Sequence, residues 1–342
     1  MKVVLNTLYI QTHGAYLHLD HETLKIKTEE RNHQFPLHHL GGIVLFGNVS
    51  ISPFLIHRCA ADGRDVIWLS EYGTFQARLS GKTTGNVLLR RAQFCLSQND
   101  QGTLDTAKYM LAGKLQNTRH VLQRAGREAK GDSDQIPLNE CAELYRQSIH
   151  NCQNANDLDQ LRGIEGYAAK SYFAVFSHMI RSNRDVFSFT ERSKRPPKDP
   201  INALLSFAYT LLANECIAAC EGVGLDPQVG FLHTIRSGRP ALALDLMEEF
   251  RVILGDRFVL TVINRNQIKP DDFIDRPGGA VYLTENGRKT FLTAYQKRKQ
   301  EEVPHLLLKE KIPLGLVPHV QARLLARYIR GDTPAYQPFI LR

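Results

Sequence analysis

The sequence has no apolar run long enough to cross a membrane and no apolar segment after its N-terminus of the kind that directs secretion. It also has no CxxC pair, because its 6 cysteines are scattered along 342 residues. Cysteines used in this way are typical of reduced thiols rather than of a disulfide framework. We therefore expect a cytoplasmic protein that does not bind a membrane.

Two common catalytic motifs are incomplete or missing. Gly81-Lys82-Thr83 resembles the end of a phosphate-binding loop, but the glycine needed five residues earlier is Gln76. An HExxH segment is absent, so neither its spacing nor a cysteine set favours zinc. These absences exclude the usual nucleotide-hydrolase and zinc-protease interpretations.

Basic residues are in excess: 43 Lys and Arg face 35 Asp and Glu, which gives a formal charge of +8. Such a balance favours a polyanionic partner, either nucleic acid or an anionic membrane surface, and the lack of a membrane segment favours nucleic acid. The charge alone is weak support for such a partner, because many basic proteins bind no polyanion.

The hydrophobic pattern changes near residue 84 and predicts an α+β chain of two domains. Short alternating or apolar runs predict strands at 8–10, 15–19, 24–27 and 42–46, and a hairpin formed by 65–69 and 74–79. Apolar residues at helical spacing predict helices at 52–61, 104–129, 137–153, 157–182, 201–221, 241–255, 284–301 and 315–330. The expected domains are 1–83, rich in strands, and 84–342, larger and all-α. Between two of the helices, three prolines and four cations at 192–200 predict a basic loop.

Three segments carry side chains that suit a metal site. Glu165 adjoins the apolar side of a helix, His233 follows two large apolar residues, and Asp245 and Glu248 share one face of a helix. Each has an ordinary explanation: a surface glutamate, a satisfied core histidine, and carboxylates paired with Arg251 or a helix N-terminus. Taken together, carboxylates and an imidazole suit Mg²⁺ or Mn²⁺, with positions left open for phosphate oxygens and water.

The same segments, in order, resemble one family. They are Arg162-Gly163-Ile164-Glu165-Gly166, Asn202 to Tyr209, Gly230-Phe231-Leu232-His233 and Leu244 to Arg251. The chain resembles the CRISPR-associated endonuclease/integrase of spacer acquisition, the universal adaptation nuclease, over nearly its whole length. It is most similar to members from type I systems, of the I-C subtype. The resemblance implies an N-terminal β-sandwich, a helical catalytic domain and a prokaryotic source.

The resemblance also implies roles for individual residues. It assigns the catalytic metal to Glu165, His233 and Glu248, and it gives Asp245 the role of supporting His233 or the metal. Arg162 matches a basic position suited to phosphate contact, and Asn202 either orients its neighbours or caps a helix. Four cations of the basic loop are candidates for following a DNA backbone: Arg192, Lys194, Arg195 and Lys198.

The implied reaction is transesterification, in which the 3′-hydroxyl of a short captured DNA attacks a phosphodiester at a CRISPR repeat. The implied partners are double-stranded DNA (the prespacer and the repeat), a second copy of the chain, and a small ferredoxin-like adaptation protein in a heterohexamer. Two alternatives stay open: a metal-dependent nuclease that only hydrolyses DNA or RNA, and a non-catalytic nucleic-acid scaffold.

Overall fold

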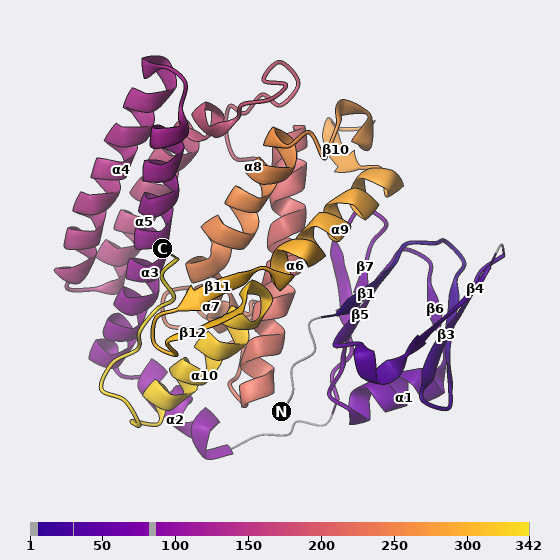
Figure 1. Cartoon of the computed structure of the whole chain (residues 1–342). Coiled ribbons are helices and arrows are strands. Elements are labelled where there is room, and N and C mark those ends of the chain that lie inside the picture. Colours follow the sequence, from indigo (N-terminus) through magenta and orange to yellow (C-terminus); the bar gives the residue numbers. More distant parts are fainter. Residues whose placement is uncertain (1–5, 30, 82–86, 342) are drawn as a thin grey trace.

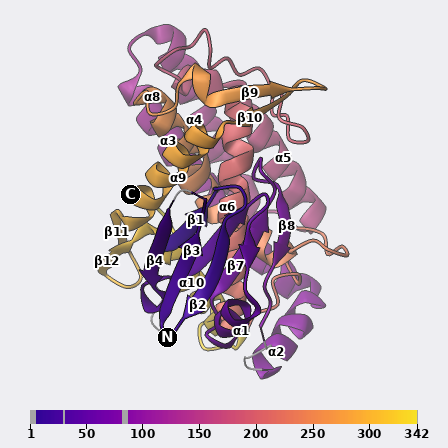
Figure 2. The same cartoon turned by 90° about the vertical axis from the view of Figure 1, so that its right-hand side faces the viewer.

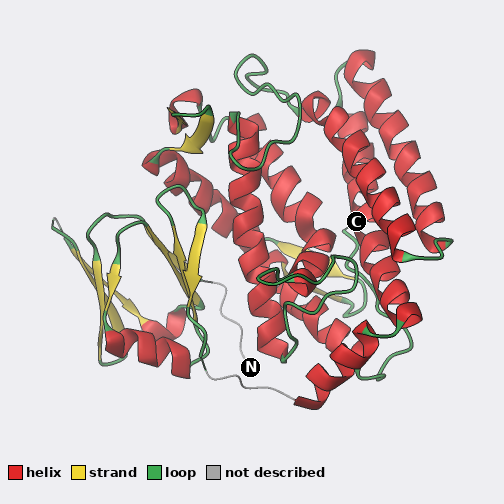
Figure 3. Ribbon diagram, turned by 180° about the vertical axis from the view of Figure 1, so that it is seen from behind, coloured by secondary structure: helices red, strands yellow, loops and turns green. Residues whose placement is uncertain are grey.

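The computed structural model describes residues 6–29, 31–81 and 87–341. The two four-stranded sheets lie at one end of the molecule and most of the long helices at the other, with short hairpins among the helices, as Figure 3 shows by colour. The predicted domain boundary at residue 83 lies outside the described residues, so the division at that point stays a prediction. The last strand before it ends at Arg78 and the first helix after it begins at Val87.

The N-terminal part contains two four-stranded sheets. One sheet has the order β1-β5-β7-β8, with parallel pairs except for the antiparallel β7–β8 hairpin, and the other has the order β4-β3-β2-β6. The bounds are β1 Thr7–Ile10, β2 Tyr16–Asp20, β3 Thr23–Lys27, β4 Asn32–Pro36, β5 Gly42–Phe46, β6 Ser50–Ile51, β7 Asp65–Leu69 and β8 Phe75–Arg78. Figure 2 looks onto these strands, with the helices behind them.

The two sheets enclose their own apolar core, as a sandwich requires. Leu17 and Leu24 come from one sheet and Ile43 and Val66 from the other, and all four are fully buried. Alternation places these side chains on the inner faces. Helix α1 (Pro53–Ala61), capped by Ser52, packs against this core with Leu55. The predicted strand-rich α+β architecture is confirmed.

The rest of the described chain is largely helical. The long helices are α2 Val87–Ser97, α3 Asp100–Glu128, α4 Asp132–Gln153, α5 Leu158–Ala174, α6 Pro200–Val223, α7 Ala241–Phe250, α8 Arg257–Asn264, α9 Glu285–Gln300 and α10 Val317–Ile329. A π-helical segment, Arg251–Asp256, joins α7 to α8. Two further hairpins are formed by β9 Phe273–Arg276 with β10 Ala280–Leu283, and by β11 Glu302–His305 with β12 Glu310–Pro313.

Helix α6 is the central element of the fold (Figure 1). It is long and apolar enough to pass a test for a membrane span, but 67% of that apolar window is buried inside the protein. The Phe207 side chain of α6 packs against Phe46 of β5 and Phe291 of α9. Burial on both sides explains why this helix is apolar all round.

Three expectations from the sequence need correction. The C-terminal part is not all-α, because it contains the β9–β10 and β11–β12 hairpins. The helix expected at 157–182 ends at Ala174 and is followed by a 3₁₀ turn at Phe176–Met179. Asn202 does not cap α6; that cap is Asp199, whose carboxylate accepts the Asn202 backbone N–H at 2.8 Å.

Candidate metal centre

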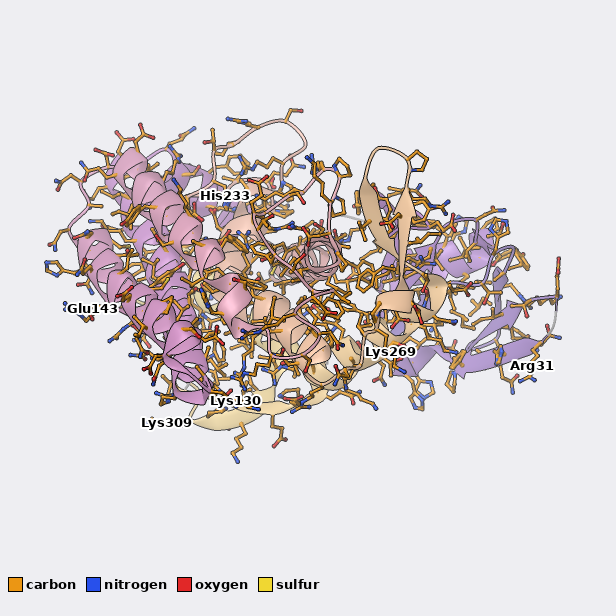
Figure 4. The ribbon with its side chains drawn as sticks, turned by 90° about the horizontal axis from the view of Figure 1, so that it is seen from above. Arg31, Lys130, Glu143, His233, Lys269 and Lys309 are labelled. Carbon is orange, nitrogen blue, oxygen red and sulfur yellow. The ribbon has the colours of Figure 1, made fainter. Side chains whose placement is uncertain are left out.

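Four chain segments bring the predicted residues together with one unpredicted lysine. Glu165 lies in the middle of α5, Glu248 near the end of α7, and His233 in the loop that leads into α7. Lys114 comes from α3, which packs against both α5 and α7. Figure 4 shows His233 in the helical part of the molecule, at a distance from the outer tip of the sheets that carries Arg31.

Lys114 bridges the two glutamates. Its ammonium lies 2.5 Å from Glu165 Oε1 and 2.7 Å from Glu248 Oε2. Both Lys114 and Glu248 are buried, whereas Glu165 is partly exposed. A buried cation between two carboxylates shows that this point in the protein strongly favours positive charge.

Neighbouring cations stabilise Glu248 as an anion. Burial by itself raises the pKa of a carboxyl group, but Lys114, Arg251 and His233 outweigh it and hold the pKa of Glu248 at about 2. The Arg251 guanidinium lies 3.1 Å from Glu248 Oε1, and His233 Nε2 lies 4.0 Å from the same oxygen. Glu248 is therefore ionised at neutral pH and faces the imidazole.

Asp245 fixes the loop that presents His233. Its two carboxylate oxygens accept backbone N–H groups from Phe231, Leu232 and His233 at 2.6–3.0 Å. Oδ1 also lies 2.6 Å from His233 Nδ1. We assign the Nδ1 proton to this contact, which leaves the Nε2 lone pair directed at Glu248. This is the geometry that the predicted supporting role of Asp245 requires.

Gly230 lets the loop that carries His233 lie close to Asp245 and the start of α7. A Cβ atom at Gly230 would lie 2.7 Å from Asp245 Oδ2 and 2.8 Å from the backbone nitrogen of Leu242. A side chain there would push the His233 loop away from α7. The glycine in Gly-Phe-Leu-His is thus part of the machinery that positions the histidine.

Behind the site, the π-helical segment holds a buried charge cluster. The Arg251 guanidinium stacks on the Tyr209 ring, with 4.6 Å between the guanidinium carbon and the ring centroid. The Tyr209 hydroxyl donates a hydrogen bond to Asp256. A π-helical segment frequently marks a functional site. Here it places both Arg251 and Asp256 on the Tyr209 side of the helix.

The donor set suits a hard divalent cation, although the side chains are not in a ligating arrangement. Among residues 6–29, 31–81 and 87–341, no group of three His, Cys, Asp or Glu side chains is close enough to hold one ion. Lys114 already supplies positive charge there, and Glu248 Oε2 has no hydrogen bond of good geometry despite the nearby ammonium. Two carboxylates and one imidazole with a free Nε2 fit Mg²⁺ or Mn²⁺ once Lys114 moves aside.

The predicted basic residues fall into two groups. Lys194, Arg195 and Lys198 are exposed. Arg162 is partly exposed and donates to the carbonyl of Leu232, beside His233. These four stay candidates for DNA contact.

Arg192 differs from the other predicted DNA-contacting cations, because its guanidinium is hydrogen-bonded within the protein. It donates to Asn202 Oδ1 at 2.6 Å and to Ser206 Oγ at 3.0 Å. Asn202 also accepts the Ser193 backbone N–H at 3.1 Å and donates to the carbonyl of Glu191. Asn202 therefore orients the start of the basic loop, and Arg192 holds the loop on α6.

Lys194 interacts electrostatically with the glutamates of the site. Desolvation and the charges of Arg251 and Arg192 lower the pKa of Lys194, whereas Glu248 and Glu165 raise it. The loop thus contributes a cation within Coulombic reach of the site.

Sequence reasoning missed Lys114 and Tyr209. Lys114 is one of 43 basic residues and belongs to no short motif. Its only signal is its position on the buried side of a long helix, beside Leu111 and Leu115. A lysine there needs a charged partner, but the sequence alone does not say which.

Comparison with known sequences identifies the family. Residues 8–297 match the family model described as CRISPR associated protein Cas1. The chain is 53% identical, over the full length of both sequences, to the CRISPR-associated endonuclease Cas1 1 of Moorella thermoacetica. It is 47% identical to the CRISPR-associated endonuclease Cas1 1 of Chlorobaculum tepidum, again over both full lengths.

Solved structures share the fold at low sequence identity. A Cas1 protein from Thermotoga maritima superposes with a TM-score of 0.80 at 21% identity, covering 95% of this chain and 97% of that one. A casposase bound to integration product superposes with a TM-score of 0.83 at 22% sequence identity, and the match covers 97% of this chain and 92% of the casposase chain. A chain of a Cas6-RT-Cas1–Cas2 complex superposes with a TM-score of 0.82 at 22% sequence identity, and the match covers 98% of this chain and 36% of that one.

These structural similarities show the fold alone, and the two relatives of higher sequence identity support the family assignment. With a family model over most of the chain and about half of all residues identical to full-length relatives, the chain belongs to the Cas1 family of CRISPR-associated endonucleases.

Proposed function

We propose that Glu165, His233 and Glu248 hold a Mg²⁺ or Mn²⁺ ion and that this centre carries out the phosphodiester transfer of spacer acquisition. The chain is a Cas1 endonuclease/integrase of CRISPR spacer acquisition. The observation that supports the metal assignment is the Lys114 ammonium between Glu165 and Glu248, together with His233 Nε2 at 4.0 Å from Glu248 Oε1. A cation already bridges the two carboxylates, and the imidazole lies near the other oxygen of Glu248.

The chain's own residues define how this centre would work. When bound, the ion would polarise the scissile phosphate and lower the charge on the departing oxygen. Asp245 holds the His233 imidazole by its Nδ1 proton, so that Nε2 faces Glu248. Lys114 and Arg251 keep Glu248 ionised. Glu248 therefore needs no proton transfer before it binds a cation.

Four cations are proposed to bind the DNA backbone next to the centre: Arg162, Lys194, Arg195 and Lys198. Exposed Tyr167 and Gly166 lie beside Glu165 on α5. A Cβ atom at Gly166 would meet no described atom within 4 Å. The surface of α5 next to Glu165 in the sequence is therefore open to solvent.

We further propose the assembly and setting that the family suggests. The chain would act in the prokaryotic cytoplasm as a homodimer, and two dimers would join a dimer of the small adaptation partner. The Cas6-RT-Cas1–Cas2 complex supports such a partner, because its Cas1 region shares this fold. The I-C subtype stays a prediction, which the genes next to this one would test.

A strand-transfer assay tests the function. Duplex DNA with free 3′-hydroxyls is incubated with a plasmid that contains a CRISPR repeat, in Mn²⁺ and with the partner protein. We expect integration products from the wild-type chain and from the control Glu143→Gln, an exposed glutamate paired with Arg146. Glu165→Gln, His233→Ala and Glu248→Gln should each reduce product by at least about a hundredfold, as loss of a metal site does.

The other outcomes distinguish the alternatives. Degradation of the plasmid without joined DNA would favour a nuclease that only hydrolyses. Unchanged products from folded Glu248→Gln would contradict the metal site and favour a non-catalytic scaffold.

A further inference from the structure

The last segment of the chain runs back across the helices that carry the metal centre. We call Tyr336–Leu341 the strap. Figure 1 shows the end of the chain, in yellow, returning to α3. Tyr336 and Phe339 are almost completely buried although the strap contains no helix or strand.

Glu249 binds the strap from α7. Its side chain is fully buried; Oε1 accepts the Tyr336 hydroxyl at 2.5 Å and Oε2 accepts the Phe339 backbone N–H at 2.8 Å. Gln321 of α10 donates to the same carboxylate at 3.1 Å and to the carbonyl of Gln337 at 3.0 Å. Glu249 directly follows Glu248, so the strap is attached to the backbone that presents a proposed metal ligand.

Asn117 and His120 bind the strap from α3. The Asn117 amide donates to the carbonyls of Glu249 and Phe339 at 2.9 and 2.8 Å, and its oxygen accepts the Leu341 N–H at 2.9 Å. His120 Nδ1 lies 2.8 Å from the carbonyl of Leu341. Asn117 is almost one helical turn beyond Lys114, so a single side chain joins α3, α7 and the strap next to the site.

Packing at Gly113 completes the arrangement. A Cβ atom there would lie 2.6 Å from Pro338 Cβ and 3.4 Å from Glu249 Cγ. Only a glycine lets the strap lie this close to α3. Phe339 also packs against Phe250, which follows Glu249 on α7.

We infer that the strap is a positioning device for the metal centre: it fixes the spacing of α3 and α7, and thereby the distance between Lys114 and Glu248. This inference rests on the proposed function, because it assigns the strap's effect to that centre. Asn117, Glu249 and Gly113 are positioning residues, since they act on the site through the backbone of the two helices.

Two variants of the full-length chain test this role. Gly113→Ala displaces Pro338 without removing a hydrogen bond, and Asn117→Ala removes the two bonds to the strap and the one to α7. Gly222→Ala is the matched control for the first variant, because Gly222 is also helical but has no described atom within 4 Å of an added Cβ. Mn²⁺ affinity is measured by titration calorimetry, and release of the strap by hydrogen exchange at Phe339 and Leu341.

We expect faster exchange at both amides and roughly tenfold weaker Mn²⁺ binding in each test variant, with far-ultraviolet circular dichroism unchanged. Duplex DNA binding in EDTA should stay at the wild-type level, as should every property of Gly222→Ala. If one of the two variants Gly113→Ala and Asn117→Ala unfolds, the Mn²⁺ affinity of the other tests the inference. Wild-type Mn²⁺ affinity in the folded variants would overturn the inference.

Failure of the inference and failure of the proposed function give different results. If wild-type Mn²⁺ binding is insensitive to Glu248→Gln, the proposed centre is wrong. If that binding depends on Glu248 but not on Gly113 or Asn117, only the positioning role is wrong.

Discussion

Lys114 lies 2.7 Å from Glu248, and the same ammonium lies 2.5 Å from Glu165. The lysine and a divalent cation would compete for the same carboxylate oxygens. An ammonium and a divalent ion about 5 Å apart repel each other by several kcal/mol even at an effective dielectric of about 20. In the proposed centre the lysine therefore stabilises the metal-free protein and would oppose metal binding.

Lys114→Met should strengthen Mn²⁺ binding and weaken the metal-free fold. Removing the ammonium leaves two carboxylates with less compensation, so we expect at least about tenfold tighter binding, which corresponds to about 1.4 kcal/mol. The melting temperature without metal should fall, because Glu248 stays buried. Calorimetric titration and thermal unfolding measure the two effects. Lys108→Met, on the same helix, serves as the control. Weaker Mn²⁺ binding in Lys114→Met would show that the lysine assembles the site instead of competing for it.

Asp245→Asn should weaken the positioning of His233 without removing any of the three proposed metal ligands. The carboxylate accepts three backbone N–H groups and the His233 ring proton, and an amide cannot accept all four because half of it is a donor. We expect Mn²⁺ affinity and strand transfer to fall by about 10- to 100-fold. The exposed Asp185→Asn should change neither. Equal metal affinity in Asp245→Asn and wild type would contradict the assigned support.

Stability should depend on pH through Glu249. Burial raises its pKa from 4.5 to about 7, despite hydrogen bonds from Tyr336, Phe339 and Gln321. Between these values the folded chain holds a proton that the unfolded chain has lost, so the free energy of unfolding falls as the pH rises. The fall is at most about 3 kcal/mol, at about 1.4 kcal/mol per pKa unit.

The comparison with Glu249→Gln isolates this effect, since glutamine does not titrate. Urea unfolding at pH 5 and pH 8 should show the variant gaining stability relative to wild type as the pH rises. The exposed Glu140→Gln should show a constant difference. A constant difference for Glu249→Gln as well would contradict the raised pKa.

Contact between the sheets and α6 depends on Gly73. It has a φ of +84°, and a Cβ atom there would lie 2.6 Å from the Phe207 ring. Gly63 also has a positive φ, of +63°, but no described atom lies within 4 Å of an added Cβ. Gly73→Ala should therefore lower the free energy of unfolding by about 1–3 kcal/mol more than Gly63→Ala does. Equal losses in urea unfolding would show that the sheets and α6 readjust freely.

Much of the fold was predictable because local patterns and tertiary structure agree. The β7–β8 hairpin has the predicted turn at Gly73, and α6 begins near the expected residue because Asp199 and Pro200 are strong helix-start signals. The β11–β12 hairpin was missed because its turn holds Leu306, Leu307 and Leu308, which do not mark a turn. The end of α5 was missed because the apolar spacing continues through Met179.

The sequence suggested the residue types of the candidate site but not its geometry. Glu165, His233 and Glu248 each have an ordinary explanation within their own segments, and it is their order and the family resemblance that predict a metal site. That Lys114 bridges the glutamates, and that Arg192 turns inward to Asn202, depends on how distant helices pack. No local pattern in a single sequence contains this information.

The most direct test of the metal centre is a crystal structure with Mn²⁺, located by its anomalous scattering. We expect one strong peak about 2.1–2.3 Å from Glu165, His233 Nε2 and Glu248, with the Lys114 ammonium displaced from between the two glutamates. A peak bound by Asp245 in place of His233, or located away from these residues, would contradict the proposed centre.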